Sequence, residues 1–240
     1  MKIALCLHGL FNSSRDATSN GRDGFTHIKK HILDGRDVDV FVHTWDDPIV
    51  IEALYGENIK AMTSQVQKDF TWLCESNGLP LVSNSEYRPA STIFSHFYSV
   101  QKSFELMLES EIEYDIVIKS RFDLGRINRL TSGPGRGNPY PVQCINFDPC
   151  LDMTRLHTAK WQYDESEGPA DMWFYSNLPN MRHFATCYDL ISEDMCVGSE
   201  YEKWAGPANN GMINPIKAWK WFLIQSDLWD NRKRLDTEWE

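Results

Sequence analysis

The stretch YDIVIKSRFDL, residues 114–124, is rich in β-branched residues and ends abruptly in charged ones. Its apolar centre is continuous rather than alternating, which is typical of a central parallel strand buried on both faces. Arg121 and Asp123 stand two residues apart, so both side chains leave the same face of the strand. Two interpretations are open: an ion pair that closes a strand end, or a site for an anion and a metal ion.

The segments before this stretch alternate between strand and helix patterns. Strands are predicted over residues 2–8 and 37–45, which are short, apolar and bounded by glycine or proline. Helices are predicted over 25–34 and over 91–108, where apolar residues recur every three or four positions and Ser91 would be the N-cap. This alternation predicts an α/β fold with a mainly parallel central sheet, flanked by helices on both faces.

The remaining segments give weaker patterns. Residues 49–76 have apolar residues at helical spacing and are predicted to form one or two helices. Residues 125–168 are predicted to be irregular, because they contain the Gly- and Pro-rich run GPGRGNPYP. Further elements are predicted as short strands near 142–147, a strand over 171–176, helices over 180–191 and 200–205, and a last strand over 217–225.

Length and composition limit the classes of protein. With 240 residues and 42% hydrophobic residues, the chain is expected to form one globular domain over 1–240. Its formal net charge of −10 argues against a nucleic-acid-binding protein. No run is apolar enough for a transmembrane segment. Six cysteines without paired or zinc-ligand spacing indicate reduced thiols, so we expect a cytoplasmic protein.

Polar residues follow three of the predicted strands. In an open parallel sheet, ligands bind beyond the carboxyl ends of the strands. His8 and Gly9 follow the first strand, Thr44, Trp45 and Asp46 end the second, and Asp123 ends the opening stretch. We therefore expect these groups to meet at one edge of the sheet and to form a binding site.

A second acidic pattern is excluded by the same rule. Asp37-Val38-Asp39 spells D-x-D, which is a common metal-binding pattern. It stands at the start of its strand, at the edge opposite to the expected site. We interpret these two acids as surface residues.

Arg121 and Asp123 suit the chemistry of transfer from a nucleotide diphosphate. Mg²⁺ and Mn²⁺ are usually held by one or two carboxylates, with phosphate oxygens completing the coordination shell. Such an ion acts as a Lewis acid on the departing diphosphate. An arginine on the same strand face can donate hydrogen bonds to the same phosphates. By itself, the pair is also compatible with a purely structural ion pair.

Four segments, taken in order, resemble a known family. DVDVFVHTW (37–45), SHFYSVQKSFELM (95–107), YDIVIKSRFDL and DMWFYSNLPNM (171–181) are similar to bacterial and viral glycosyltransferases of the GT-A fold. This group includes the amino-terminal glycosyltransferase domain of a large chlorella-virus protein and many lipopolysaccharide or capsule synthesis proteins. The resemblance covers residues 2–225. It implies a GT-A-like domain in which 1–124 binds the nucleotide sugar and 125–240 binds the acceptor.

The resemblance also implies roles for individual residues. Arg121-Phe122-Asp123 stands where GT-A enzymes carry D-x-D, with only the last acid retained, so Asp123 is expected to bind Mn²⁺ or Mg²⁺. Relatives often carry an arginine near Phe11, whereas here the first one after the strand is Arg15. The expected donor-binding residues are His8, Gly9, Leu10, Asn12, Arg15, Thr44, Trp45, Ser95, Tyr98, Lys102, Arg121 and Asp123.

Two acids match positions on the acceptor side of these enzymes. Asp171 precedes a predicted strand, and Glu200 opens a short predicted helix. Each is a candidate for the base that an inverting enzyme needs to deprotonate the acceptor hydroxyl. Each also has a structural interpretation: Asp171 as an acid at the start of a strand, and Glu200 as an acid stabilised by the helix dipole.

The resulting functional hypothesis is a metal-assisted hexosyl- or deoxyhexosyltransferase. It would use a nucleotide-diphosphate sugar, with UDP favoured, and transfer the sugar to a glycan or glycoconjugate. The alternative is a nucleotide-sugar or glycan-binding module of the same fold that has no catalytic activity. A sulfotransferase is disfavoured, because the loop HGLFNSS has no lysine for a phosphosulfate group.

Overall fold

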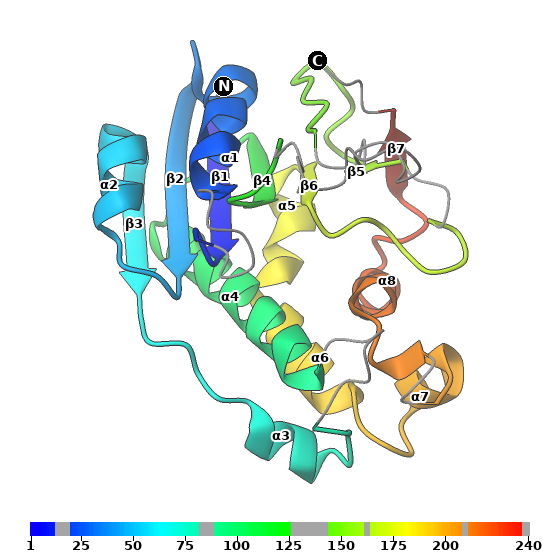
Figure 1. The fold of residues 1–240 in the computed structure, drawn as a ribbon. Coiled ribbons are helices and arrows are strands. Elements are labelled where there is room, and N and C mark those ends of the chain that lie inside the picture. Colours follow the sequence, from blue (N-terminus) through cyan, green and yellow to red (C-terminus); the bar gives the residue numbers. More distant parts are fainter. Residues whose placement is uncertain (13–19, 82–88, 126–143, 161–163, 208–210, 237–240) are drawn as a thin grey trace, which may run out of the picture.

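The computed structural model describes residues 1–12, 20–81, 89–125, 144–160, 164–207 and 211–236. These residues form a seven-stranded sheet in the order β3-β2-β1-β4-β6-β5-β7, which Figure 1 shows from left to right. The strands are β1 (Lys2–Gly9), β2 (Asp37–Thr44), β3 (Ile59–Ser64), β4 (Ile116–Arg121), β5 (Leu156–Ala159), β6 (Trp173–Ser176) and β7 (Arg232–Leu235).

The sheet is mainly parallel, with one strand reversed. β1 runs parallel to β2 and β4, and β2 runs parallel to β3. β6 is antiparallel to both of its neighbours, β4 and β5, whereas β5 and β7 are parallel. The expected α/β architecture is therefore confirmed, and the reversed β6 becomes important for the site.

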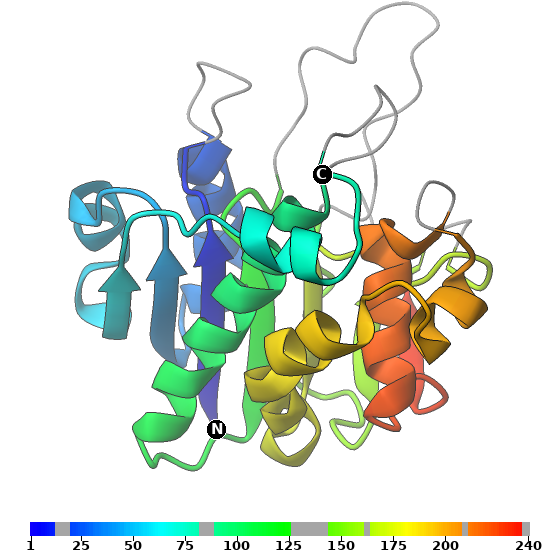
Figure 2. The same ribbon diagram turned by 90° about the horizontal axis from the view of Figure 1, so that it is seen from below.

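Helices cover both faces of the sheet. The elements are α1 (Asn20–Ile28), η1 (Lys29–Leu33), α2 (Ile49–Tyr55), η2 (Gly56–Asn58), α3 (Thr71–Ser76), α4 (Ala90–Glu109), α5 (Leu178–Met181), η5 (Arg182–Thr186), α6 (Cys187–Asp194), α7 (Glu200–Ala205) and α8 (Pro215–Gln225). In Figure 2, α4, α6 and α8 lie in front of the sheet. Residues of α1, η1 and α2 pack on the other face.

The two hydrophobic cores follow from the alternation of side chains along the strands. Ile3, Leu5 and Leu7 of β1 pack in the core that contains α1, while Ala4 and Cys6 pack in the core that contains α4. All five side chains are fully buried. β1 is thus buried on both faces, as the continuous apolar pattern predicts.

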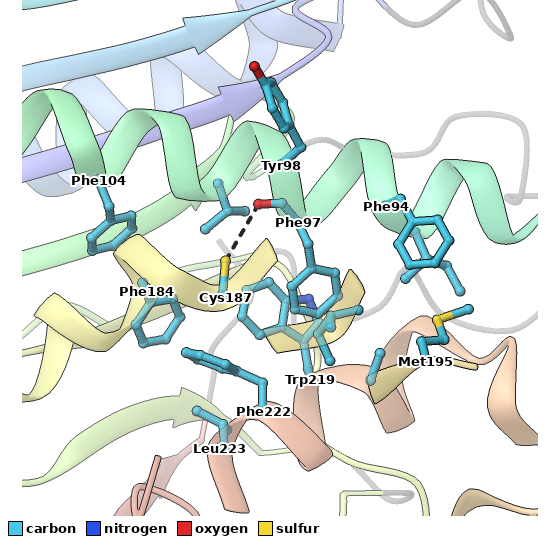
Figure 3. Close-up of a cluster of buried hydrophobic side chains, with 14 of the residues drawn as sticks. Phe94, Phe97, Tyr98, Phe104, Phe184, Cys187, Met195, Trp219, Phe222 and Leu223 are labelled. Atoms are coloured by element: carbon cyan, nitrogen blue, oxygen red, sulfur yellow. Dashed lines mark hydrogen bonds between the residues drawn. The ribbon is translucent and has the colours of Figure 1, made fainter. Parts of the chain in front are cut away.

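The core under α4 is built from aromatic rings. Phe97 of α4 stacks on Trp219 of α8, with ring centroids 4.3 Å apart, and Phe184 of η5 packs beside them (Figure 3). The thiol of Cys187 lies 3.5 Å from the backbone oxygen of Phe97, which joins α6 to α4. This aromatic layer fixes α8 against the sheet.

Two elements differ from the sequence-based predictions in type. Residues 217–225 were predicted to form a strand but belong to the helix α8. The side chain of Asn214 caps this helix and Pro215 occupies its first turn, a typical helix start. Residues 59–64, predicted to be helical, form the edge strand β3, because pairing with β2 outweighs the local pattern.

Smaller differences concern positions. α4 begins at Ala90 after Pro89 rather than behind an N-cap at Ser91, and no side chain caps it. β5 and β7 were not predicted. Residues 144–147 contain no strand, and 142–143 lie outside the described residues. The helix predicted over 180–191 is broken into α5, η5 and α6, whereas the helix over 200–205 and the strands β1, β2, β4 and β6 are confirmed.

The aromatic layer predicts a large stability difference between two tryptophans. Trp219 is fully buried, whereas Trp72 of α3 is 62% exposed. Trp219→Ala should lower the free energy of unfolding by about 3–5 kcal/mol, because it leaves a cavity that the core cannot fill. The matched control Trp72→Ala should change it by less than about 1 kcal/mol. Urea denaturation measures both, and equal losses would contradict the assigned packing.

Candidate functional site

The carboxyl ends of β1, β2 and β4 meet at one edge of the sheet, since these strands are parallel neighbours. β6 runs the other way, so its start lies at the same edge. Asp171, just before β6, is therefore brought to the ends of β1 and β4. The reversed strand explains how a residue ahead of a strand comes to share a site with residues that follow other strands.

Arg121 lies between two carboxylates at this edge. Its Nε and Nη2 donate to Oδ1 and Oδ2 of Asp123, at 2.8 and 2.7 Å. Its Nη1 reaches the carboxylate of Asp171, at 3.3–3.4 Å. Burial lowers the pKa of Arg121, but the two carboxylates outweigh this effect and hold the pKa above its ordinary value. The guanidinium is therefore always charged.

A second cation, Lys119, lies under this group. Its side chain is fully buried, and its Nζ donates to the backbone oxygen of Asp171. The same nitrogen lies 5.0 Å from the ring centroid of Phe174 and 4.9 Å from that of Trp219. Burial, together with the charge of Arg121, lowers the pKa of Lys119 to about 7, and the nearby carboxylates of Asp171 and Asp123 limit that fall.

His8 faces the same group from β1, where it is paired with Arg121 across the ladder to β4. Its ring is 2% exposed, and neither ring nitrogen has a hydrogen-bond partner among the described residues. Burial, helped by the charge of Lys119, holds the pKa of His8 well below its ordinary value. The imidazole is thus neutral at pH 7 and has one donor and one acceptor to offer.

His96 of α4 closes the group from above the sheet. Its ring packs edge-on against His8, with centroids 5.0 Å apart. Its Nε2 lies 4.0 Å from Oδ2 of Asp171 and accepts a hydrogen bond from Nε1 of Trp219, at 3.2 Å. The aromatic core and the candidate site thus meet at Trp219.

The loop after β1 is held by neighbouring elements. The backbone N–H of Gly9 donates to Oγ of Ser99, at 2.8 Å, which joins the loop to α4. The N–H groups of Phe11 and Asn12 both donate to Oδ2 of Asp46, at 2.6 and 2.8 Å. Gly9 has φ of +96°, a conformation that other residues adopt at a cost. The loop is therefore fixed by β2 and α4.

His43 joins the same network from β2. Its Nδ1 lies 2.7 Å from Oγ of Ser99, and its Nε2 lies 3.0 Å from Nε2 of Gln65. With the Gln65 amide donating to Nε2, the proton is assigned to Nδ1, which donates to Ser99. Burial and the charges of Lys102 and Lys68 lower the pKa of His43 to about 4. His43 is a neutral structural link.

A second group of residues lies beside β2 and α4. Trp45 stacks on Tyr98, with ring centroids 5.6 Å apart and planes at 20°. Nζ of Lys68 lies 4.3 Å from the Tyr98 centroid, and Nζ of Lys102 lies 5.4 Å from it. Lys102 also pairs with Glu105. The Trp45 ring with lysines nearby suits a ligand in which a planar ring is joined to an anionic group.

The predicted donor residues thus divide into three sets. His8, Arg121 and Asp123 meet Asp171 at the strand ends, while Trp45, Tyr98 and Lys102 form the neighbouring aromatic group. The hydroxyl of Thr44 donates to the backbone oxygen of Gly9, that of Ser95 accepts from Gln67, and Leu10 is 43% exposed. Arg15 lies outside the described residues.

Among the described residues, no contact joins Glu200 to the site residues at the strand ends. Its side chain is 79% exposed and pairs with Lys203 of its own helix, at 2.5 Å. It stands in the first turn of α7, directly after the N-cap residue Ser199, where the dipole favours an acid. These contacts agree with the structural interpretation of Glu200.

Asp37 and Asp39 lie at the opposite edge of the sheet, as the sequence predicts. Nζ of Lys2 lies 3.8 Å from Asp37 and 3.2 Å from Asp39. The hydroxyl of Tyr114 also donates to Asp39, at 2.8 Å. Both acids have structural partners at the amino ends of the strands.

Four polar residues of the site were missed in the sequence: His43, His96, Ser99 and Lys119. Each of them had a signal. His43 and Lys119 interrupt apolar strands, and His96 and Ser99 lie three apart within the apolar pattern of a helix. A polar side chain that must be buried needs a partner, and each of these finds one at the sheet edge.

The arrangement does not fit a divalent metal at Asp123. Both oxygens of that carboxylate accept hydrogen bonds from Arg121, so an ion would first have to displace the guanidinium. Across the described ranges, no three His, Cys, Asp or Glu side chains gather closely enough to hold a metal ion. Both acids at this edge instead accept hydrogen bonds from Arg121, and the buried Lys119 donates to the backbone oxygen of Asp171.

No helix in the described part of the chain is both long and apolar enough to cross a membrane.

Comparisons with known proteins give weak structural likenesses. No family model and no curated protein matches the chain. Among solved structures, mouse xyloside xylosyltransferase 1 in its apo form is 12% identical, with 97% of this chain and 85% of that chain covered and a TM-score of 0.48.

Two further structures have lower TM-scores. A glycosyltransferase involved in the glycosylation of the major capsid of PBCV-1 is 11% identical, with 85% of this chain and 74% of that chain covered and a TM-score of 0.34. A cytidylyltransferase from Leptospira borgpetersenii serovar Hardjo-bovis is 9% identical, with 98% and 99% covered and a TM-score of 0.35. At these values the function has to be inferred from the site.

The neutral state of His43 predicts a loss of stability in acid. The unfolded chain binds a proton near pH 6.5, whereas folded His43 binds it near pH 4. Above pH 6.5, His43 is neutral in both states and does not lower the free energy of unfolding. As the pH falls from 6.5 to 4, the free energy of unfolding falls by about 3 kcal/mol in all, because the unfolded chain takes up the proton first. Urea denaturation between pH 7.5 and about 4 measures the loss.

His43→Gln should flatten this profile, and the exposed His183→Gln should leave it unchanged. His8 acts in the same direction, so part of the pH dependence should remain in His43→Gln. A His43→Gln profile identical to that of the wild type would contradict the assigned network.

Proposed function

We propose that this protein is a glycosyltransferase that uses a nucleotide-diphosphate sugar, with UDP favoured, and a glycan or glycoconjugate acceptor. The assembly of Arg121, Lys119, His8 and Asp171 at the carboxyl edge of the sheet supports this assignment most directly. This edge is where ligands of open α/β sheets bind. The resemblance of four ordered segments to GT-A enzymes agrees with it.

The donor would lie across the two groups of site residues. Trp45, which stacks on the buried Tyr98, would offer an aromatic surface for the base, and the fixed loop 8–12 would border the nucleoside. Arg121 would donate to the diphosphate at the end of β4. Residues 1–124 thus supply the donor half, and the acceptor half, residues 125–240, contributes Asp171 at the boundary.

The proposed reaction forms a bond between the acceptor hydroxyl oxygen and the anomeric carbon of the sugar. The bond from that carbon to the β-phosphate oxygen breaks, and its electron pair leaves with the nucleoside diphosphate. Asp171 is the candidate base for the hydroxyl proton if the configuration is inverted. Glu200 is not retained in this role, because it is exposed and paired with Lys203.

The expected Mn²⁺ or Mg²⁺ ion stays a prediction outside this proposal. A metal at Asp123 would require Arg121 to move, as described above. The proposed steps therefore use residues of the chain alone, and addition of metal is one arm of each binding experiment below.

A binding module without catalytic activity is the alternative function. The ion pair of Asp123 with Arg121 favours the binding module, because an acid whose role is to hold an arginine need not take part in a reaction. Asp171 argues against it, since a carboxylate at the carboxyl edge of the sheet can accept the proton of a bound hydroxyl.

A donor panel tests the substrate class. UDP-, GDP- and dTDP-sugars should be compared with a CMP-sugar, which has no diphosphate, each with and without MnCl₂. Binding is followed by calorimetry and slow donor hydrolysis by release of the nucleotide. We expect one diphosphate sugar to bind at least tenfold more tightly than the CMP-sugar, because a diphosphate makes additional charge-assisted hydrogen bonds. Equal binding of all donors, or none, would refute the proposed function.

Two substitutions separate the enzyme from the binding module. Asp171→Asn keeps an oxygen that accepts from Arg121 but cannot take a proton, so donor hydrolysis or transfer should fall about 100-fold or more. Its donor Kd should stay within about threefold of the wild type. The control Glu200→Gln should retain full activity. A wild-type rate that never exceeds the uncatalysed rate would favour the binding module.

A further inference from the structure

Both carboxylates at the sheet edge have a cationic partner within the described residues. Asp123 and Asp171 each accept hydrogen bonds from Arg121, and the buried Lys119 donates to the backbone oxygen of Asp171. A site that needs a divalent cation keeps its carboxylates free for it, because negative charge in excess attracts the ion. Here the carboxylates already have partners inside the protein, so an added ion would have to compete with both.

The geometry of Arg121 gives the same result. The guanidinium presents its Nε and Nη2 edge to Asp123, and both bonds are short, at 2.8 and 2.7 Å. This fork is the strongest arrangement that an arginine and a carboxylate can form. Asp171, which precedes β6, holds the remaining nitrogen, Nη1. Two carboxylates next to the ends of different strands therefore fix the orientation of one cation.

Two polar groups next to each other are left for a ligand. Nη2 of Arg121 uses one N–H on Asp123, and no acceptor for its second N–H is found among the described residues. His8, its neighbour across the β1–β4 ladder, is 2% exposed and has both ring nitrogens unpaired there. A buried imidazole without hydrogen bonds is costly, and a bound polar group would satisfy it. The unpaired groups thus mark a place for an oxygen-rich anion.

We infer that the diphosphate subsite works without a divalent metal: Arg121 takes the position of the metal, and Asp123 and Asp171 hold it there. His8 completes the subsite by donating one N–H to a phosphate or sugar oxygen. Asp123 and Asp171 are then positioning residues toward Arg121. When the bond between the sugar and the diphosphate breaks, the negative charge that develops on the phosphate is stabilised by the guanidinium.

This inference rests on the proposed function and predicts how binding responds to chelation. UDP is the probe, and its Kd is measured by calorimetry in buffer with EDTA and in buffer with MgCl₂ or MnCl₂. The two Kd values should agree within about threefold, because the protein supplies the cation. Arg121→Met should weaken UDP binding at least tenfold in both buffers, since it removes a charge-assisted hydrogen bond.

A double-mutant cycle tests whether Asp123 acts through Arg121. Asp123→Asn loses one bond of the fork and should weaken UDP binding several-fold, with the response to metal unchanged. In the Arg121→Met background the same substitution should have no further effect, because the residue it positions is gone. Asp39→Asn is the matched control: it also neutralises an acid paired with a cation, but at the opposite edge, and should leave the Kd unchanged.

Folding is checked for every variant by its urea midpoint, and Arg121→Lys is a second variant that keeps the charge but not the fork. It should also bind UDP more weakly than the wild type, since a lysine cannot bond in two places at once. If Arg121→Lys bound UDP as tightly as the wild type, the fork would be irrelevant and the inference would be overturned.

The other outcomes separate the inference from the proposed function. UDP binding that requires Mg²⁺ or Mn²⁺, and that Asp123→Asn abolishes, would overturn the inference and leave a metal-dependent glycosyltransferase. A loss on Asp123→Asn that is undiminished in the Arg121→Met background would overturn the positioning role. Absence of UDP and sugar-nucleotide binding in both buffers would overturn the proposed function itself.

Discussion

The bonds of Arg121 to Asp123 and Asp171 join two strands that run in opposite directions. Asp123 follows β4 and Asp171 precedes β6, so the arginine ties the end of one strand to the start of the next. This cross-link stands over the buried Lys119, whose charge needs nearby acids. Without the reversed β6, Asp171 would lie at the far edge of the sheet and the two cations would share one acid.

The rule that ligands bind beyond strand ends predicted much of this site from sequence. It placed His8, Thr44 and Asp123 at one edge and excluded Asp37 and Asp39, because only strand direction is needed for that step. It did not place Asp171 at this edge. The direction of β6 depends on its pairing with β4 and β5. Its four residues are all buried, and such a pattern is expected whether the strand is parallel or antiparallel to its neighbours.

Other misses have the same physical origin. Trp219 and Phe222 belong to a run that is apolar at almost every position, so neither strand nor helix periodicity stands out. The residues that indicate a helix stand at its start: Asn214 is the N-cap and Pro215 lies in the first turn. The sequence of the edge strand β3 gave no indication of a strand. Its residues are only partly buried, and their extended conformation depends on pairing with β2.

Trp219 belongs to the core and to the site at once. Its ring stacks on Phe97, its N–H donates to His96, and Lys119 lies over its face. A change in this one layer therefore alters packing, the orientation of an imidazole and the environment of a buried cation together. Selection for thermal stability and selection for chemistry cannot act separately here. Homologous proteins that differ at this layer should differ both in stability and in the geometry of the candidate site.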